Sequence, residues 1–118
     1  MANRHRGEIS AELGGKNHTL CLTLGALAGL EDAFGVSGLA ALAARLDGNR
    51  LSARDLVAII GAGLRGAGST LDDAAVAGLT SPAGVPGYVR IVVGLLAATF
   101  GVEPEPSQPA NPPEPQDA

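Results

Sequence analysis

The sequence predicts a mainly α-helical α+β domain in which an N-terminal β-hairpin packs on a bundle of four to five short helices. Hydrophobic residues alternate with period two close to the N-terminus, which is the pattern of half-buried strands. From Thr23 onward they recur at three- and four-residue steps, which is the pattern of amphipathic helices. Because an isolated hairpin is barely stable, this order along the chain favours helices that cover one face of it.

Two alternating segments give the expected hairpin. Residues 8–13 place three aliphatic side chains on one side, and residues 18–24 place three leucines on one side. The four residues between them, 14–17, begin with two glycines, which tolerate the positive φ angles of a turn. We therefore expect an antiparallel pair of strands with one buried face and a turn over residues 14–17.

Five helix starts are expected where a side-chain oxygen can accept a hydrogen bond from the free amides of a first turn. These residues are Thr23, Ser37, Ser52 with Asp55 as a capping box, Thr70 and Ser81. The helices that follow are expected to end near Phe34, Leu46 (before Asp47-Gly48), Gly66, Leu79 and Phe100. Pro86 does not fit the interior of a helix that starts at Pro82, so it marks either a kink or the true start.

The foldable part of the chain is expected to be one small domain over residues 1–101. The remaining segment, residues 102–118, holds six of the eight prolines, four acidic residues and no basic residue. It lacks the apolar side chains that would offset the entropy of ordering, so we predict a disordered acidic tail with polyproline character. Such a tail acts as a solubilising appendage or, alternatively, as a docking strand for a protein that recognises proline-rich segments.

Charge, cysteine content and hydropathy exclude several classes of protein. The net charge is −4 and the tail accounts for all of it, so residues 1–101 lack the net basic face with which nucleic-acid binders neutralise phosphates. Cys21 is the only cysteine, which excludes an internal disulfide. The longest apolar run, residues 91–100, is too short for a bilayer, and the N-terminus does not resemble a secretory signal. We expect a cytoplasmic protein without nucleic acid or membrane as a partner.

One segment imitates the glycine pattern of dinucleotide-binding proteins. Gly61, Gly63 and Gly66 have G-x-G-x-x-G spacing, which lets a backbone approach a pyrophosphate when a strand leads into it. Here the capping box at residues 52–55 starts a helix where that fingerprint requires a strand, and no acidic residue stands about 20 positions later. We expect instead that the glycines permit close packing of a helix, or weaken it until a partner binds.

The sequence contains no group of residues that predicts catalysis or metal binding. His18 and Cys21 are three apart on a predicted strand and so face opposite sides, and only His5 remains as another His or Cys ligand. The adjacent acids Asp72 and Asp73 project in different directions and cannot form an acid/base pair alone. We therefore predict no enzyme activity, no cofactor and no metal, and we assign no catalytic residue.

Protein association is the remaining class. The helical region is rich in leucine, alanine, valine and glycine. We expect exposed apolar edges at Val57, Ile59, Ile91 and Leu95, because helices that are apolar on more than one face usually bury the second face against a partner. The sequence does not locate the contact surface.

The order of several short segments carries a family resemblance. They are residues 8–13, His18–Gly35, Leu51–Leu56, Gly63–Gly68, Ser81–Gly84 and the helix end Ala97-Ala98-Thr99-Phe100-Gly101. Together they resemble the small tail protein family of gene transfer agents and prophages, which is related to the tail assembly chaperones of long-tailed phages. The resemblance covers about residues 6–101 and excludes the proline-rich tail.

The resemblance implies a non-enzymatic role in tail assembly. Such chaperones coat the helical tape-measure protein, keep its apolar stretches soluble and recruit tail-tube subunits. The implied partners are therefore the tape-measure protein and the tail-tube protein, and self-association is a further expectation. Family descriptions also name tail tube proteins, so the alternative is a structural tail tube or tail-completion component. A chaperone is expected in the cytoplasm of the producing bacterium, and a structural component in the particle tail.

Overall fold

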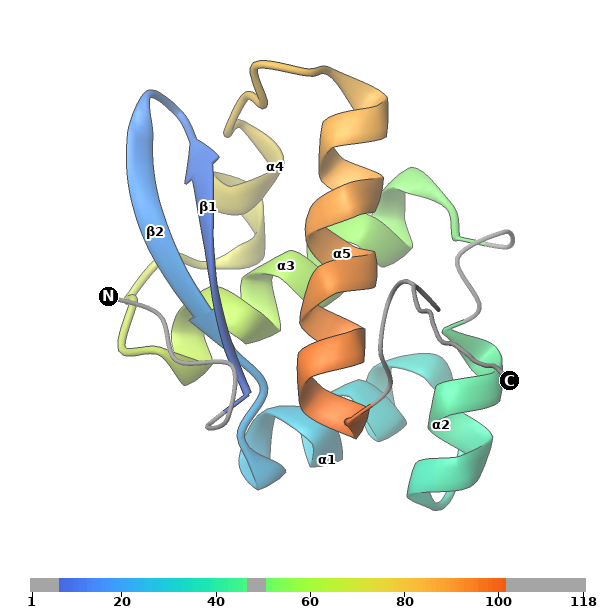
Figure 1. Cartoon of the computed structure of the whole chain (residues 1–118). Helices are drawn as coiled ribbons and strands as arrows, with labels where there is room; N and C mark the ends of the chain where they lie inside the picture. The colour runs from blue at the N-terminus through green and yellow to red at the C-terminus, as the bar shows by residue number, and fades with distance from the viewer. Residues whose placement is uncertain (1–6, 47–50, 102–118) are drawn as a thin grey trace, which may run out of the picture.

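The structure is a computed structural model that describes residues 7–46 and 51–101. Its elements are β1 (Glu8–Leu13), β2 (Lys16–Cys21), α1 (Leu24–Phe34), α2 (Leu39–Arg45), α3 (Ala53–Gly66), α4 (Asp73–Ala77) and α5 (Val85–Phe100). Figure 1 shows the hairpin upright on one side of the helices, with α1 and α2 along the lower end of the molecule. The predicted fold class, a hairpin followed by a set of short helices, is confirmed over these residues.

The hairpin turns more tightly than the sequence pattern indicates. β1 and β2 are antiparallel with Leu13 opposite Lys16, so the turn consists of Gly14 and Gly15 alone. Both glycines have positive φ, at 61° and 82°, as a two-residue turn that matches the twist of the strands requires. The predicted four-residue turn is wrong, and β2 lies earlier than predicted because Thr23 already caps α1.

The side-chain caps of α1 and α3 confirm two predicted helix starts. The Ala26 amide donates to Oγ1 of Thr23 at 3.0 Å, and Gly35 ends α1 in the left-handed conformation as predicted. At α3 the Asp55 amide donates to Oγ of Ser52 at 3.1 Å, and the Ser52 amide donates to Oδ2 of Asp55 at 3.0 Å. This reciprocal pair is the expected capping box.

The predicted caps of α2 and α4 are wrong by one and two residues. Gly38 is the residue before the first turn of α2, and its φ is 94°. A residue with a side chain, such as serine, is strained at this φ, so glycine suits the position and the predicted cap, Ser37, lies one residue earlier. α4 follows Asp72, whose Oδ1 accepts a hydrogen bond from the Ala75 amide at 2.9 Å. A carboxylate accepts this bond better than the Thr70 hydroxyl, since it also interacts favourably with the helix dipole.

α5 starts later than the predicted cap at Ser81. Val85 is its first residue, and Pro86 lies in its first turn, where a missing amide costs no hydrogen bond. The Ser81 hydroxyl instead accepts a hydrogen bond from the Ala83 amide at 3.3 Å in the preceding turn. Of the two alternatives, Pro86 therefore marks the true start of the helix. Gly101 ends it as predicted, with a φ of 75°.

α3 is the centre of the fold. It contacts β2, α1, α4 and α5, and eight of its fourteen residues are buried. The largest fully buried side chains of the protein are Leu13, Leu20, Leu42, Leu46, Ile59, Leu64, Val92 and Leu95. Because neighbours surround α3 on several sides, its apolar residues occupy more of its circumference than a single stripe.

Most of the apolar edges expected on the surface are covered by the chain itself. Ile59 and Leu95 are both 0% exposed, so the prediction that they lie on the surface is wrong. Val57 and Ile91 are half-buried. The second apolar face of α3 needs no external partner because other elements of the fold pack on it. The exposed large apolar residues are instead Leu24, Leu39, Val85 and Val93.

Two predictions fall outside the described residues. These are the helix stop at Asp47-Gly48 and the character of the tail over residues 102–118. Within the described ranges, no single helix has the length and apolar composition of a membrane span; α1 and α2 pass that test only when counted together across a bend of 62°.

Candidate protein-binding groove

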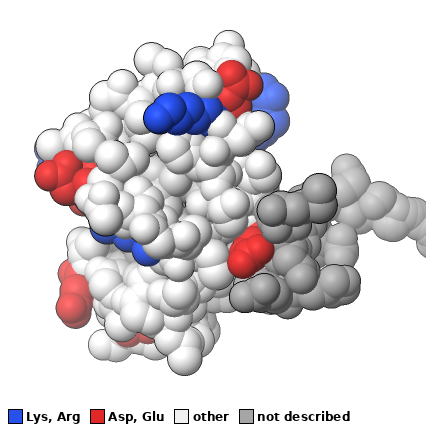
Figure 2. Space-filling model, turned by 90° about the vertical axis from the view of Figure 1, so that its left-hand side faces the viewer, with Lys and Arg blue, Asp and Glu red and all other residues white. Residues whose placement is uncertain are grey.

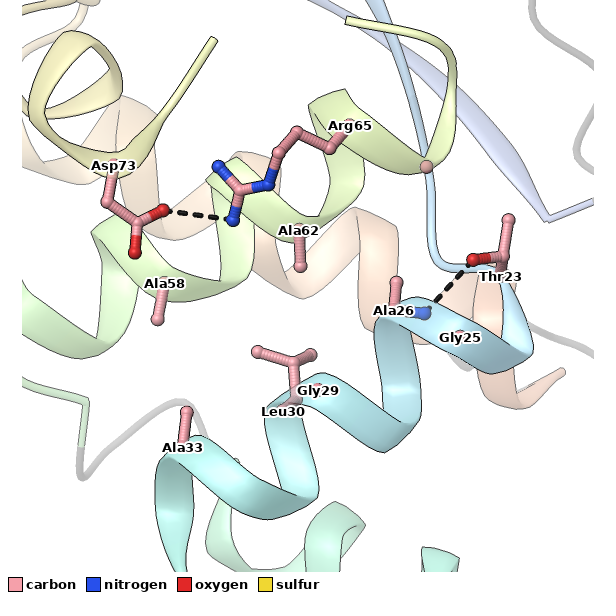
Figure 3. A pocket seen from close by; sticks show the side chains of 11 residues that line it. Thr23, Gly25, Ala26, Gly29, Leu30, Ala33, Ala58, Ala62, Arg65 and Asp73 are labelled. Carbon is pink, nitrogen blue, oxygen red and sulfur yellow. Dashed lines mark hydrogen bonds and ion pairs between the residues drawn. The ribbon is translucent and has the colours of Figure 1, made fainter. Parts of the chain in front are cut away.

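A groove of about 410 Å³ lies between α1 and α3. Its lining residues are Thr23, Gly25, Ala26, Gly29, Leu30, Ala33, Ala58, Ala62, Arg65, Gly66 and Asp73. Figure 3 shows small side chains of the two helices facing each other across the gap, with Leu30 pointing into it from α1. Because Leu30 is only 3% exposed, it forms the floor of the groove.

The groove exists because both helices carry small residues at four-residue spacing. The two series are Gly25, Gly29 and Ala33 on α1, and Ala58, Ala62 and Gly66 on α3. Residues four apart share one face of a helix, so each series forms a low wall. No atom lies within 4 Å of a Cβ added to Gly29, which shows that the wall of α1 is open there.

Sequence reasoning did not find this groove, although a signal was present. The spacing of the small residues is visible in the sequence, but the two series belong to helices that are far apart in the chain. Small residues in a helix also occur on faces that pack closely, as Gly63 does. Only the packing of α1 beside α3 brings the two series together.

An ion pair lies at the end of the groove next to α4. Nη2 of Arg65 is 3.0 Å from Oδ1 of Asp73, and Nη1 of Arg65 donates to the Leu71 carbonyl oxygen at 3.0 Å. Gly61 leaves room for this pair, because a Cβ there would lie 2.7 Å from the same Asp73 oxygen. The Arg65 and Asp73 side chains are 40% and 58% exposed, so the pair contributes little to stability and presents both charges to solvent.

A second hollow, of about 290 Å³, lies on the opposite face of α3 beside α4 and the start of α5. Its walls are apolar and include Leu56, Ile60, Val76 and Val85. The Tyr88 hydroxyl donates to a backbone carbonyl oxygen at 2.7 Å, which holds the ring in the wall. This hollow is smaller than the α1–α3 groove and has no charged residue in its lining.

The glycine motif serves helix packing. Gly61, Gly63 and Gly66 all lie in α3, so the strand that a dinucleotide fingerprint requires is a helix here. A Cβ on Gly63 would lie 2.7 Å from the Leu95 side chain, and a Cβ on Gly66 would overlap the Cys21 carbonyl oxygen. These glycines therefore let β2 and α5 approach α3. Close packing, one of the two roles expected for them, is confirmed.

The residues considered for metal binding or catalysis have separate surroundings. His18 and Cys21 lie on opposite faces of β2, and the His18 ring lies 3.1 Å from a backbone carbonyl oxygen of β1. Asp72 caps α4, and Asp73 belongs to the ion pair of the groove. His5 lies outside the described residues. In the part of the chain that the structure describes, no three His, Cys, Asp or Glu residues are placed to hold a metal ion.

The fold is a hairpin with a set of short helices, and the candidate site is the groove between α1 and α3. The chain belongs to the family described as "Phage tail tube protein, GTA-gp10", whose model matches residues 6–102. The predicted membership in a gene transfer agent and phage tail family is thereby confirmed. This family is structural and works through protein–protein contacts within the tail. No curated protein and no solved structure matches the chain.

Proposed function

We propose that this protein is a tail assembly chaperone that binds helical segments of the tape-measure protein in the α1–α3 groove and helps to recruit tail-tube subunits. The observation that carries the proposal is the groove itself, about 410 Å³ in volume and lined by small residues of two helices. Family membership supports a role in the phage-like tail. The groove adds a surface of the kind that accepts a helix.

The groove suits one face of an amphipathic helix. A helix with its side chains is about 10–12 Å across, so a hollow of this size takes a short row of apolar side chains and not the whole helix. Residues at i, i+3, i+4 and i+7 of the client supply such a row. Glycine and alanine walls let the client approach closely and select little for side-chain shape, which suits a long client with many similar helical segments.

The charged groups have supporting roles in this proposal. Arg65 and Asp73 at one end of the groove offer a partner to a client charge of either sign, because their own pair is half exposed and easily exchanged. The acidic segment 102–118 keeps the loaded complex soluble by mutual repulsion. The chaperone acts in the cytoplasm, where tails are assembled, and needs no cofactor.

Filling the groove tests its assignment. Ala33 lines the groove and is exposed, so Ala33→Trp should block the row of client side chains and weaken binding about tenfold or more. Ala28 is exposed on α1 but does not line the groove, so Ala28→Trp is the matched control and should bind like the parent. Isothermal titration calorimetry with helical tape-measure fragments measures both. Equal affinities of the two variants would contradict the assignment.

A structural role as a tail tube or tail-completion component is the second candidate, and the family description favours it. Mass spectrometry of purified particles beside producer-cell lysate separates the two roles. A chaperone is absent from particles but retained on tape-measure fragments in a pull-down. A structural component is present in particles at fixed stoichiometry and binds tube subunits instead.

A further inference from the structure

The apolar hollow at the start of α5 is separate from the α1–α3 groove. It measures about 290 Å³, and none of its lining residues is charged. Its walls come mainly from α3, α4 and the first turn of α5. The hollow and the groove have no lining residue in common, so a side chain that enters the hollow does not occupy the groove.

α1 carries an exposed apolar side chain that is followed by acidic residues. Among the described residues, Leu24 is the most exposed large apolar one, at 79%. It is the first residue of α1, and Glu31 and Asp32 follow on the same face, two turns later. α1 has no basic residue. In Figure 2, which is turned about the vertical axis of Figure 1, the lower end of the molecule shows acidic but no basic side chains.

Two exposed arginines stand beside the hollow. Arg54 of α3 and Arg90 of α5 each follow a lining residue, Ala53 and Val89. Successive residues of a helix point about 100° apart, so the two arginines flank the apolar lining and are not part of it. Neither forms an ion pair with a carboxylate of the described residues. Both charges are therefore available to a partner.

The acidic residues close to the hollow have other positions or contacts. Asp55 of α3 is buried and bound to an arginine of α2. Asp72 caps α4, and Asp73 pairs with the arginine of the groove. Glu12 is next to the lining residue Leu13 but points to the opposite face of β1. The walls formed by α3 and α5 thus match the outer face of α1 both in apolar character and in charge.

The two complementary surfaces lie at different ends of the molecule. Figure 1 shows the start of α5 at the upper end and α1 along the lower end. α5 runs between these ends and has 16 residues, so it is about 24 Å long. Leu24 therefore cannot reach the hollow of its own chain.

We propose that Leu24 of one copy of this chain inserts into the apolar hollow of a second copy. The acidic residues that follow it on α1 then approach the two arginines beside that hollow, so the surfaces are electrostatically complementary. Each copy uses two different surfaces, which makes the contact heterologous. Such a contact repeats from copy to copy and yields rings or filaments instead of closed twofold dimers.

Charges introduced at either surface test the proposal. Leu24→Asp removes the apolar side chain, and Val85→Glu puts a carboxylate at the hollow, which Val85 lines while being 65% exposed. Each is the first residue of its helix, where an acid suits the helix dipole, so both variants should fold like the parent. Each alone should self-associate about tenfold more weakly or worse. Sedimentation velocity of the full chain over a concentration series measures this, and thermal melting checks the fold.

A mixture of the two variants tests whether the contact is heterologous. Leu24→Asp keeps an intact hollow and Val85→Glu keeps an intact Leu24, so an equimolar mixture should form pairs that grow no further. A mixture that stays monomeric would overturn the proposal. A mixture that assembles like the parent would also overturn it, because each variant has only one working surface.

Leu39→Asp is the matched control. Leu39 is also an exposed leucine at the first position of a helix, and the substitution changes the net charge equally. α2 has no acidic residue, so it lacks the charge match of α1, and this variant should associate like the parent. A parent chain that stays monomeric at its highest soluble concentration would contradict the proposal. A Val85→Glu variant that self-associates normally but loses tape-measure fragments would assign the hollow to the client instead.

Discussion

Gly66 and Gly29 both lie in helices, yet their surroundings are opposite. A Cβ on Gly66 would overlap the Cys21 carbonyl oxygen, whereas a Cβ on Gly29 would meet no atom within 4 Å. Gly66→Ala should therefore lower the free energy of unfolding by about 2–4 kcal/mol, since the backbone of β2 cannot move aside cheaply. Gly29→Ala should raise it by up to about 1 kcal/mol, because alanine is the better helix former.

Urea denaturation of the two alanine variants beside the parent measures this difference. Both substitutions add the same methyl group to a helical glycine, so helix propensity alone predicts the same sign for both. A Gly66→Ala variant as stable as the parent would show that Gly66 of α3 does not lie against the Cys21 carbonyl oxygen of β2.

Asp55 joins two helices, because it caps α3 and also binds a side chain of α2. It caps α3 through Ser52, and Arg45 of α2 donates to its two carboxylate oxygens at 3.3 and 3.4 Å. The Arg45 guanidinium also lies 4.7 Å from the centre of the Phe34 ring, which adds a cation–π contact to α1. Burial opposes the charged form of Asp55, but the Ser52 amide and Arg45 outweigh it and lower the pKa of Asp55 below 3.8.

The lowered pKa of Asp55 predicts how stability depends on pH. Its interactions stabilise the fold fully above the ordinary value near 3.8, and this contribution is lost as the pH falls through the lower folded value. Asp55→Asn should therefore cost about 1–3 kcal/mol at neutral pH and progressively less in strong acid. Urea denaturation at neutral pH and below pH 3.8 tests this.

The control for the pH prediction is Asp32→Asn, because Asp32 is an exposed aspartate on α1. This variant should follow the parent at every pH. A cost of Asp55→Asn that is the same in acid as at neutral pH would show that the carboxylate charge is not what joins α2 to α3.

The elements differ in how far local sequence predicts them. α1 and α3 begin where predicted, because the capping hydroxyl and the amide it binds are only three residues apart. The predicted caps of α2, α4 and α5 are wrong because each has a competing candidate within a few residues, although Pro86 was one of the two predicted starts of α5. The residues that cap these helices are Gly38, Asp72 and Gly84.

For the whole molecule, the boundary at residue 101 is a proposal that truncation tests. Residues 1–101 contain eight basic and eight acidic residues. Removing residues 102–118 should leave the free energy of unfolding within about 0.5 kcal/mol of the parent, but lower the solubility near neutral pH, because repulsion between chains is lost. Circular-dichroism melting and precipitation assays measure the two effects.

A scrambled tail of the same composition is the control for the truncation. It should restore solubility if net charge is what the tail contributes. Loss of helical signal on truncation would instead place part of the tail in the folded domain. Solubility that only the native order restores would favour a specific docking strand.

Several properties of this protein are determined by its sequence alone, because they depend on residues close together in the chain. They include the hairpin, the two cleanly capped helices, the equal numbers of basic and acidic residues in residues 1–101 and the pattern of segments that marks the family. Tertiary structure alone decided which apolar faces are covered, what the glycines of α3 contact and where the groove lies. The physical reason is that burial depends on neighbours from distant parts of the chain. Gly29 and Ala62 become two walls of one groove only because α1 packs beside α3.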